Sequence, residues 1–411
     1  MVIDERELAC IVLALDGSSE LSAPFLVAVA ARPVPPELTS LLADATSILS
    51  LCWRLEHAQL QEERLRTADA RTREAVLHLL MNGHVTAARQ VAGALLPALP
   101  DALQVYVIEG PSAKRGAAAQ ALAGAADGAW IVPCPVYADH LLVLAPAAVE
   151  GGAADAAWPR AVTSTCWIGV SDAVTLRDTA TGYAQAFHAL AAARQRVERH
   201  ASFAGHPDLA LTIGPAATAW AESFLAPLLA YRARRSQDPD SAVLLATAAS
   251  WLSFSSRATA HLKIHRNTLT ARLALIRELL GVDLDQIGNQ AELALALRAL
   301  AAHGRPRPDA APSLDELLAL PHVVAWAERQ FRPLRGPEAP ECVEETLTTW
   351  LRLDARMGPT AQALSLSASA VRKRLARGEA LLQRSLLRSP SAVYDLWLAL
   401  RALESSPRVP R

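Results

Sequence analysis

The stretch Ser241–Leu300 reads SAVLLATAASWLSFSSRATAHLKIHRNTLTARLALIRELLGVDLDQIGNQAELALALRAL. Its apolar residues recur at helical spacing until Ser255-Ser256 interrupts the pattern. The sequence therefore predicts a helix, a tight turn, a short second helix, another turn at Lys263–His265 and a longer helix from Arg266. Gly281 follows the last apolar position of that helix and is a suitable residue to end it.

Polar side chains occupy the predicted exposed side of the last helix. Arginine and asparagine on the N-terminal turns of such a helix can read base edges in the major groove. We therefore expect double-stranded DNA to be the partner of this segment. The residues on that side are Arg266, Asn267, Thr270, Arg272 and Arg277.

The same stretch resembles the C-terminal helix-turn-helix of the PucR/CdaR family of bacterial transcriptional regulators, whose pattern is roughly HRNTLRYRLxRIEELTG. The resemblance rests on His265–Leu269, Arg272-Leu273, Ile276, Glu278-Leu279 and Gly281. Thr270, Ala271 and Ala274 replace positions that are usually basic or aromatic in that family, so this copy is expected to make fewer phosphate contacts. The resemblance implies DNA contacts by His265, Arg266, Asn267, Thr268, Thr270, Arg272 and Arg277.

A second, diverged copy of the segment follows. Trp251-Leu252 recurs as Trp350-Leu351, and Arg272-Leu273 recurs as Arg374-Leu375. The string LALRAL occurs at Leu295–Leu300 and again at Leu398–Leu403, and Ala219–Glu222 recurs as Ala325–Glu328. Four matches in order indicate a tandem duplication, joined by the Pro- and Arg-rich linker His303–Pro312. Tryptophans at equivalent positions of the two copies are expected in the core.

The second copy has Ser367-Ala368-Ser369 where the first has His265–Asn267, so it lacks long donors for reading bases. It is instead rich in basic residues, which suits phosphate binding without sequence information. A solvated basic face is the alternative. The basic residues are Arg372, Lys373, Arg374, Arg377, Arg384 and Arg388, of which the first four are expected to contact DNA.

The first hundred residues predict two strands at 8–15 and 24–31, separated by Asp16–Ser19, and a long helix from near Glu37 toward Leu80. This order is similar to the closing part of a GAF sensor domain. Gln59–Arg73 is charged on most faces, which favours a solvated connecting helix over a dimerising coiled coil, and Asn82-Gly83 is a natural stop. A homodimer remains open, as does pairing of the strands with a partner.

The middle of the chain predicts strands at 103–108, 130–134, 140–144 and 167–170, with helices at 114–126 and 176–199 and a loop opened by Gly151-Gly152. This order indicates an α+β domain. Trp167–Ser171 resembles the GGDEF-like domain of CdaR-type regulators. The sequence contains neither a GGDEF string nor paired carboxylates at metal-binding spacing, so cyclase activity is not expected.

Composition sets further bounds. The 411 residues carry a net charge of −1, so any affinity for DNA must come from a local patch. The acidic N-terminus, the lack of a long apolar run and five scattered cysteines favour a cytoplasmic protein without a membrane segment. No catalytic motif appears, and His265 has no second ligand at metal-binding spacing, so neither an enzyme nor a cofactor or metal is expected.

We therefore expect a multidomain α+β protein, with an N-terminal α/β sensing half followed by mostly α-helical tandem helix-turn-helix modules. The expected function is an effector-responsive DNA-binding transcriptional regulator. The alternative is a protein-interaction or ligand-sensing scaffold that no longer reads DNA. The expected parts are partial GAF-like strands and a helix at 1–55, a connecting helix at 56–83, a GGDEF-like domain at 84–200, a helix-turn-helix module at 205–303 and its diverged copy at 313–404.

Overall fold

The structure is a computed structural model that describes residues 7–15, 24–93, 95, 97–111, 113, 115–125, 128–147, 165–233, 235, 237–302, 312–337 and 339–405. It divides into two compact units, Met1–Thr72 and Arg73–Arg411. The expected loop at Gly151-Gly152, the turn at Asp16–Ser19 and nearly all of the linker His303–Pro312 lie outside the described residues.

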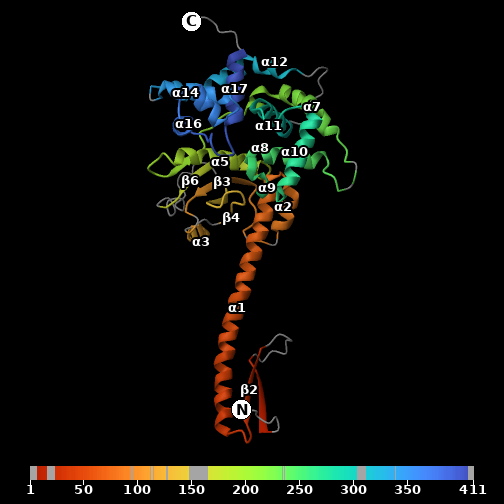
Figure 1. Ribbon diagram of the computed structural model, residues 1–411, viewed down its shortest axis with the longest axis vertical. Coiled ribbons are helices and arrows are strands. Elements are labelled where there is room, and N and C mark those ends of the chain that lie inside the picture. The colour runs from red at the N-terminus through yellow and green to blue at the C-terminus, as the bar shows by residue number, and fades with distance from the viewer. Residues whose placement is uncertain are drawn as a thin grey trace. The chain divides into compact units, whose positions relative to one another are not determined.

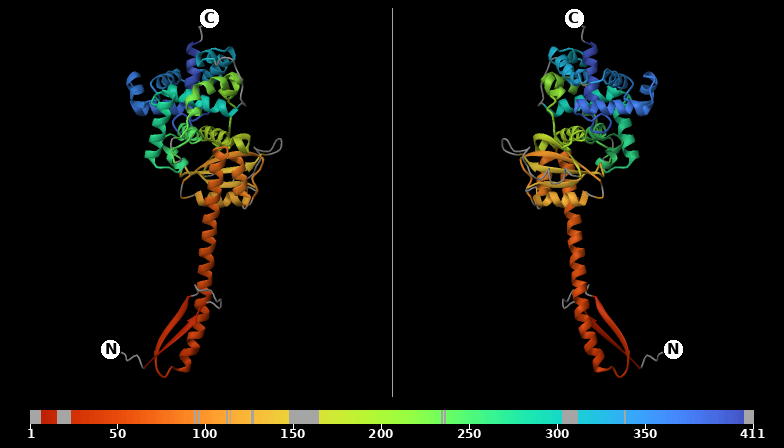
Figure 2. Two further views of the ribbon diagram at one scale, coloured as in Figure 1. Left: turned by 90° about the vertical axis from the view of Figure 1, so that its right-hand side faces the viewer. Right: turned by 90° about the vertical axis from the view of Figure 1, so that its left-hand side faces the viewer.

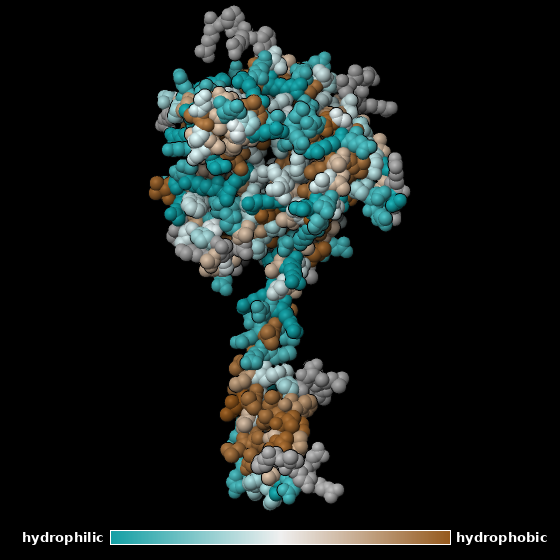
Figure 3. All heavy atoms as spheres, viewed as in Figure 1, coloured by the Kyte–Doolittle hydropathy of each residue, from teal (hydrophilic) through white to brown (hydrophobic). Residues whose placement is uncertain are grey.

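The first unit contains the predicted hairpin. Strands β1 (Leu8–Ala14) and β2 (Phe25–Ala31) pair antiparallel, with Val12 opposite Val27 (Figure 1). Helix α1 (Pro36–Met81) begins in this unit, as predicted, and the surface of the unit gathers hydrophobic side chains (Figure 3).

Helix α1 ends in the second unit, and Gly83 follows it with a φ of +74°, which confirms the predicted stop. The charged part of the helix is exposed, as expected for a solvated connector. Its last turns are different, because Val76, Leu77 and Leu80 are buried in the core of the second unit. A short helix, α2 (Val85–Ala92), follows.

The second unit opens with a five-stranded sheet in the order β4-β5-β3-β6-β7. All neighbouring strands are antiparallel except β6 and β7, which run parallel. Helix α5 packs on β6 and β3 and lies between the sheet and the helices that follow it in the chain (Figures 1 and 2). The strands are β3 (Ala102–Glu109), β4 (Trp130–Pro133), β5 (His140–Pro146), β6 (Trp167–Thr175) and β7 (His200–Ser202), and the helices are α3 (Arg115–Ala125) and α5 (Thr179–Ala193).

The end of this domain differs from the prediction. The helix expected at 176–199 begins with a 3₁₀ turn at Leu176–Asp178 and ends at Ala193, and β7 was missed. A three-residue strand is too short to show an alternating pattern, so only its pairing with β6 reveals it. Gly169 allows α5 to approach β6 closely, since a Cβ there would lie 2.0 Å from the Ala186 carbonyl oxygen.

The C-terminal part consists of two equivalent sets of six α-helices, which we call the first module (209–302) and the second module (314–405). The first comprises α6 (Leu209–Ile213), α7 (Pro215–Ala230), α8 (Ser241–Phe254), α9 (Ala258–Leu262), α10 (Arg266–Leu280) and α11 (Ile287–Ala302). The second comprises α12 (Leu314–Leu318), α13 (Pro321–Phe331), α14 (Glu341–Arg352), α15 (Met357–Ala363), α16 (Ala368–Leu382) and α17 (Val393–Ser405).

The backbone repeats at the helix ends as well. Residues with left-handed φ angles follow the first, second and third helices of each helix-turn-helix. The equivalent pairs are Ser255 (50°) and Asp354 (55°), Lys263 (54°) and Ser365 (53°), and Gly281 (66°) and Gln383 (52°). This agreement supports the duplication, because a left-handed residue that is not glycine is uncommon.

One hydrophobic core runs through both modules. Helices α11 and α17 pack against each other, with Trp397 of α17 against Gly288 of α11. The Trp326 indole N–H donates to the Pro207 carbonyl oxygen at 2.8 Å, which links the second module to the chain just before α6. The modules are therefore packed together as one body rather than held apart by their linker.

Candidate nucleic-acid interface

The turn between α9 and α10 presents the base-reading residues expected from the sequence. His265 is the N-cap of α10, and its Nδ1 accepts a hydrogen bond of 3.2 Å from the Asn267 backbone N–H. Lys263 takes the left-handed conformation that ends α9. The side chains at the start of α10 are exposed, namely His265, Arg266, Asn267, Thr268 and Thr270.

Arg272 and Arg277 lie further along α10 and are bonded within the first module. Arg272 Nη1 donates a hydrogen bond of 3.3 Å to Thr247 Oγ1 on α8. Arg277 Nη2 forms an ion pair of 2.7 Å with Asp285 Oδ1 in the α10–α11 connection. Both side chains are half-buried, in contrast to Arg266.

The second module repeats this arrangement. Ser367 caps α16, with its Oγ accepting from the Ala370 backbone N–H at 3.1 Å. Arg374 Nη1 donates to Thr346 Oγ1 of α14 at 3.3 Å, which reproduces the Arg272–Thr247 contact. The other three basic residues expected to contact DNA, Arg372, Lys373 and Arg377, are exposed or half-exposed.

The other two basic residues singled out from the sequence of the second copy, Arg384 and Arg388, do not belong to an exposed basic face. Arg384 is only 5 % exposed and donates to Gln330 Oε1 at 2.9 Å and to Asp395 Oδ2 at 2.5 Å. Arg388 donates to Glu109 Oε1 of β3 at 2.6 Å. The expectation that they add to a phosphate-binding density is wrong for Arg384, because its charge is neutralised inside the protein.

The turn between α9 and α10 (Lys263–His265) and the start of α10 contact the end of α1 and the α+β domain. Lys263 Nζ, two residues before the N-cap of α10, forms an ion pair of 2.9 Å with Glu74 of α1. The rings of His78 and His261 lie 5.2 Å apart, and Leu269 is buried in the core of the α+β domain. Burial lowers the pKa of His261 to about 4, and the neighbouring His78 adds to this effect. The turn between α9 and α10 therefore contacts the domain that is expected to sense an effector.

The second module is attached to the same domain by a different set of contacts. Glu109 accepts hydrogen bonds from Arg388 (2.6 Å) and from Arg194 of the α+β domain (2.7 Å). Burial acts to raise the pKa of Glu109, but the nearby His140, with Nε2 at 3.8 Å, and the hydrogen bonds from the two arginines outweigh it and hold the pKa well below its usual range. The Tyr137 hydroxyl donates to the Ser389 carbonyl oxygen.

One group of residues has the composition of a metal site. In the described part of the chain, Glu109, Asp139 and His140 each bring one potential ligand atom within 4.8 Å of the others. Both carboxylates also face arginine, because Arg194 and Arg388 pair with Glu109 and Arg388 lies 3.7 Å from Asp139. These ion pairs balance the carboxylate charges, so the group acts as an attachment point for the second module.

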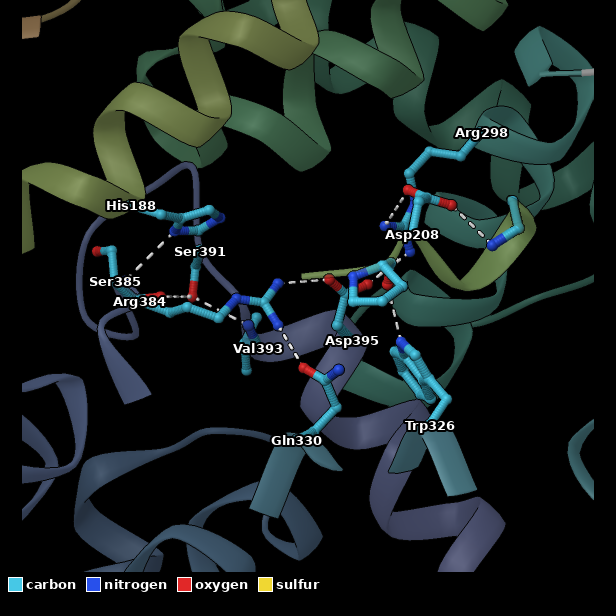
Figure 4. Close-up of polar contacts among 12 residues, drawn as sticks. His188, Asp208, Arg298, Trp326, Gln330, Arg384, Ser385, Ser391, Val393 and Asp395 are labelled. Atoms are coloured by element: carbon cyan, nitrogen blue, oxygen red, sulfur yellow. Dashed lines mark hydrogen bonds and ion pairs between the residues drawn. The ribbon is translucent and has the colours of Figure 1, made fainter. Parts of the chain in front are cut away.

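A partly buried ion-pair network lies where α5, α11 and α17 meet (Figure 4). Asp395 of α17 accepts from Arg298 Nη2 at 2.6 Å and from Arg384 Nη2 at 2.5 Å, and Arg298 Nη1 donates to Asp208 at 3.2 Å. Beside the network is a cavity of about 210 Å³ between α5, α8, α11 and α17, lined in part by Ala184, His188, Leu252, Leu297, Arg298 and Tyr394. Burial lowers the pKa of His188 to about 3, so the imidazole that α5 contributes to the cavity is uncharged at neutral pH.

Comparison with known families identifies the modules. Residues 244–299 and 344–402 each match the family model of the PucR C-terminal helix-turn-helix domain. No curated protein matches the chain. Among the described residues, no helix is long and apolar enough to cross a membrane. The two matched ranges cover α8–α11 and α14–α17, which confirms the duplication read from the sequence.

Proposed function

We propose that this chain, in which two segments match the PucR C-terminal helix-turn-helix domain, is a DNA-binding regulator of the PucR type and that one polypeptide occupies both half-sites of its operator. A single helix-turn-helix ordinarily needs a second copy in a dimer, because two half-sites supply the affinity that one does not. Here both copies belong to one body, which is proposed to act in the cytoplasm and to respond to an effector.

The observation that carries this proposal is a pair of equivalent ion-pair sets between the modules. Arg298 of α11 bonds Asp208 beside α6 and Asp395 on α17. Its counterpart in the second module, Arg401 of α17, bonds Asp315 on α12 at 2.8 Å and Glu292 on α11 at 2.6 Å. Each arginine thus ties its own module to the last helix of the other, as expected of an interface with two-fold symmetry.

The drift between the copies favours a division of labour. In the first module, the exposed side chains of Arg266 and Asn267 are proposed to discriminate bases. In the second module, the exposed side chains of Arg372, Lys373 and Arg377 are proposed to bind phosphates, since the side chains at the start of α16 are short. The first module is therefore proposed to recognise the base sequence of one half-site, and the second module to bind mainly the phosphates of the other.

Binding to the chain's own upstream DNA and to random DNA, measured over a range of salt concentrations, tests both roles. Arg266→Ala or Asn267→Ala should cost about 1–3 kcal/mol on the specific site and little on random DNA. Arg372→Ala, Lys373→Ala and Arg377→Ala combined should weaken both and flatten the salt slope by about 0.9 for each phosphate that is no longer neutralised. If the parent binds neither DNA, the chain is a scaffold that no longer reads DNA, and if it binds but none of these variants alters binding, other residues contact the DNA.

The cavity beside Asp395 supports an effector role, since it borders α5 of the α+β domain and helices of both modules. The cavity is lined by apolar side chains such as Leu252 and Leu297 and by the polar side chains of Arg298, Tyr394 and Asp395, so a small ligand with both an apolar and a polar part suits it. Ala184→Phe would fill this cavity from α5. The expected result is that the variant keeps DNA binding but no longer responds to compounds that shift the melting temperature of the parent. If the variant still responds, the effector binds elsewhere.

A further inference from the structure

Exposed hydrophobic residues are concentrated in the first unit. Among the described residues, sixteen large hydrophobic side chains are exposed, and eleven of them lie in the first unit although it is much the smaller of the two. Figure 3 shows a brown, hydrophobic surface on the N-terminal hairpin and the start of α1. The eleven are Val12, Phe25, Val27, Val29, Leu41, Ile48, Leu49, Leu51, Leu55, Leu60 and Leu65. Soluble monomers rarely expose so much contiguous apolar surface.

The hairpin contributes one apolar face. Val12 pairs with Val27 and is 57 % exposed, while Val29 and Phe25 on the same face are 62 % and 61 % exposed. The alternate residues of both strands are half-buried and also apolar. A two-stranded hairpin is marginally stable at best in water, so an uncovered apolar face on it calls for a partner.

Helix α1 contributes a stripe with heptad spacing. Leu41, Ile48 and Leu55 are seven residues apart at a positions, and Leu51 occupies the d position between Ile48 and Leu55, whereas Asp44 occupies the d position before Ile48. Their exposed fractions are 65 %, 66 %, 57 % and 61 %, respectively. The stripe precedes the charged segment 59–73, where the apolar pattern is not sustained.

We propose that the hairpin face and this stripe form a homodimer interface, and that its occupant is a second copy of the same chain. An isologous interface must be self-complementary, and an apolar heptad stripe meets this condition. Four of the flanking e and g positions carry small, uncharged residues, which do not repel one another across a dimer axis, and Arg54 at the last g position is the charged exception. The four are Ser40, Ala45, Ser47 and Cys52.

The available area matches what a dimer requires. A large aliphatic or aromatic side chain loses roughly 60–120 Å² of apolar surface when it is fully buried. The nine exposed side chains from Val12 to Leu55 are 41–66 % exposed, so they offer several hundred Å² per chain. A stable interface buries about 800 Å² per partner, and the hairpin backbone and small residues of the face supply the remainder. This interface is separate from the one between the modules and goes beyond the DNA-binding function.

Sedimentation of the full chain at micromolar concentration tests the proposal. The parent should sediment as a dimer of two 43.8 kDa chains, and Ile48→Glu with Leu55→Glu should give monomers whose second unit unfolds as in the parent. Leu211→Glu, at a helical leucine of the second unit that is 61 % exposed, is the matched control and should remain dimeric. A monomeric parent, or a double variant that stays dimeric, would overturn the proposal.

Crosslinking provides a second readout that does not depend on a destabilising charge. Ile48 lies in the middle of the stripe, so it meets its counterpart whether the two helices run parallel or antiparallel. Ile48→Cys, in a chain with Cys10→Ser and Cys52→Ser, should form a disulfide-linked dimer under mild oxidation. Val243→Cys, at an exposed position of the second unit, should not. Failure to crosslink through residue 48, or binding of the parent to phospholipid vesicles as a monomer, would contradict a second copy as the occupant.

Discussion

Arg298 on the last helix of the first module donates a hydrogen bond of 2.6 Å to Asp395 on the last helix of the second. Arg384 bonds the other oxygen of the same carboxylate. Burial acts to raise the pKa of Asp395, but the two arginines outweigh it and hold the pKa far below the usual range, so the carboxylate stays charged. The contact thus joins the two modules through a buried charge that depends on both arginines.

Asp395→Asn should therefore destabilise the second unit strongly. The variant leaves Arg384, whose side chain is only 6 % exposed, without its anionic partner, and removing one partner of a buried ion pair costs about 3–5 kcal/mol. Glu292→Gln is the matched change in the equivalent Arg401 pair, whose side chains are 28 % and 22 % exposed, and should cost about 1 kcal/mol. Urea unfolding at neutral pH measures both. Equal losses would mean that burial of Asp395 does not set its contribution.

Arg272→Ala should alter stability rather than sequence preference. Its guanidinium bonds Thr247 of α8, so the variant loses one hydrogen bond, worth about 1 kcal/mol. Arg374→Ala should behave alike, because Arg374 makes the same contact with Thr346. Unfolding and the ratio of specific to random DNA binding are measured on the same preparations. A changed ratio with unchanged stability would return Arg272 to the base-reading set.

The helix-turn-helix could be predicted well from the sequence because its determinants are local. The N-cap at His265, the stop at Gly281 and the helical spacing between them are contained in seventeen consecutive residues, and the structure has all three. The duplication was likewise visible, since each copy carries the same local pattern.

The surroundings of the recognition helices could not be predicted, because they depend on contacts between distant segments. Lys263 meets Glu74, and Arg388 meets Glu109 across 279 residues of separation. The sequence predicts Arg384 to be one more basic residue of a phosphate-binding surface, whereas its guanidinium group donates hydrogen bonds to Gln330 and Asp395. A count of charges along the chain does not distinguish an arginine facing solvent from one with a buried partner.

Gly169→Ala should disrupt the packing of α5 on the sheet. A Cβ at this position would lie 2.0 Å from the Ala186 carbonyl oxygen and 2.4 Å from the Leu190 backbone nitrogen, and backbone atoms cannot rotate away. The expected cost is about 3 kcal/mol. Gly116→Ala in α3 is the control, since nothing lies within 4 Å of its Cβ position, and should be neutral or stabilising by up to about 1 kcal/mol. Unfolding curves that do not separate the two variants would show that α5 can shift to admit the methyl group.

Stability should fall as the pH drops from about 6.5 to 4. Burial lowers the pKa of His261 to about 4 and that of His188 to about 3, both below the usual 6.5 for histidine. In this window the unfolded chain binds more protons than the folded chain, so protonation favours unfolding. Each such histidine lowers the free energy of unfolding by up to about 1.4 kcal/mol for each pH unit of this window. The low pKa values of Asp395 and Glu109 act in the same direction but only below about pH 4, where unfolded carboxylates titrate.

His261→Phe isolates one of these contributions. The ring lies 4.6 Å from Phe254 and 5.2 Å from His78, so phenylalanine can replace its packing without its proton. At pH 8 the His261 ring of the parent is neutral, as is the phenylalanine of the variant. Between pH 8 and pH 5 the free energy of unfolding should fall by about 2 kcal/mol less in the variant than in the parent. Urea unfolding at pH 8, 6.5 and 5 measures the difference between the two profiles. Parallel profiles would mean that His261 titrates alike in the folded and unfolded chains, and its burial between α1 and the first module would then carry no pH dependence.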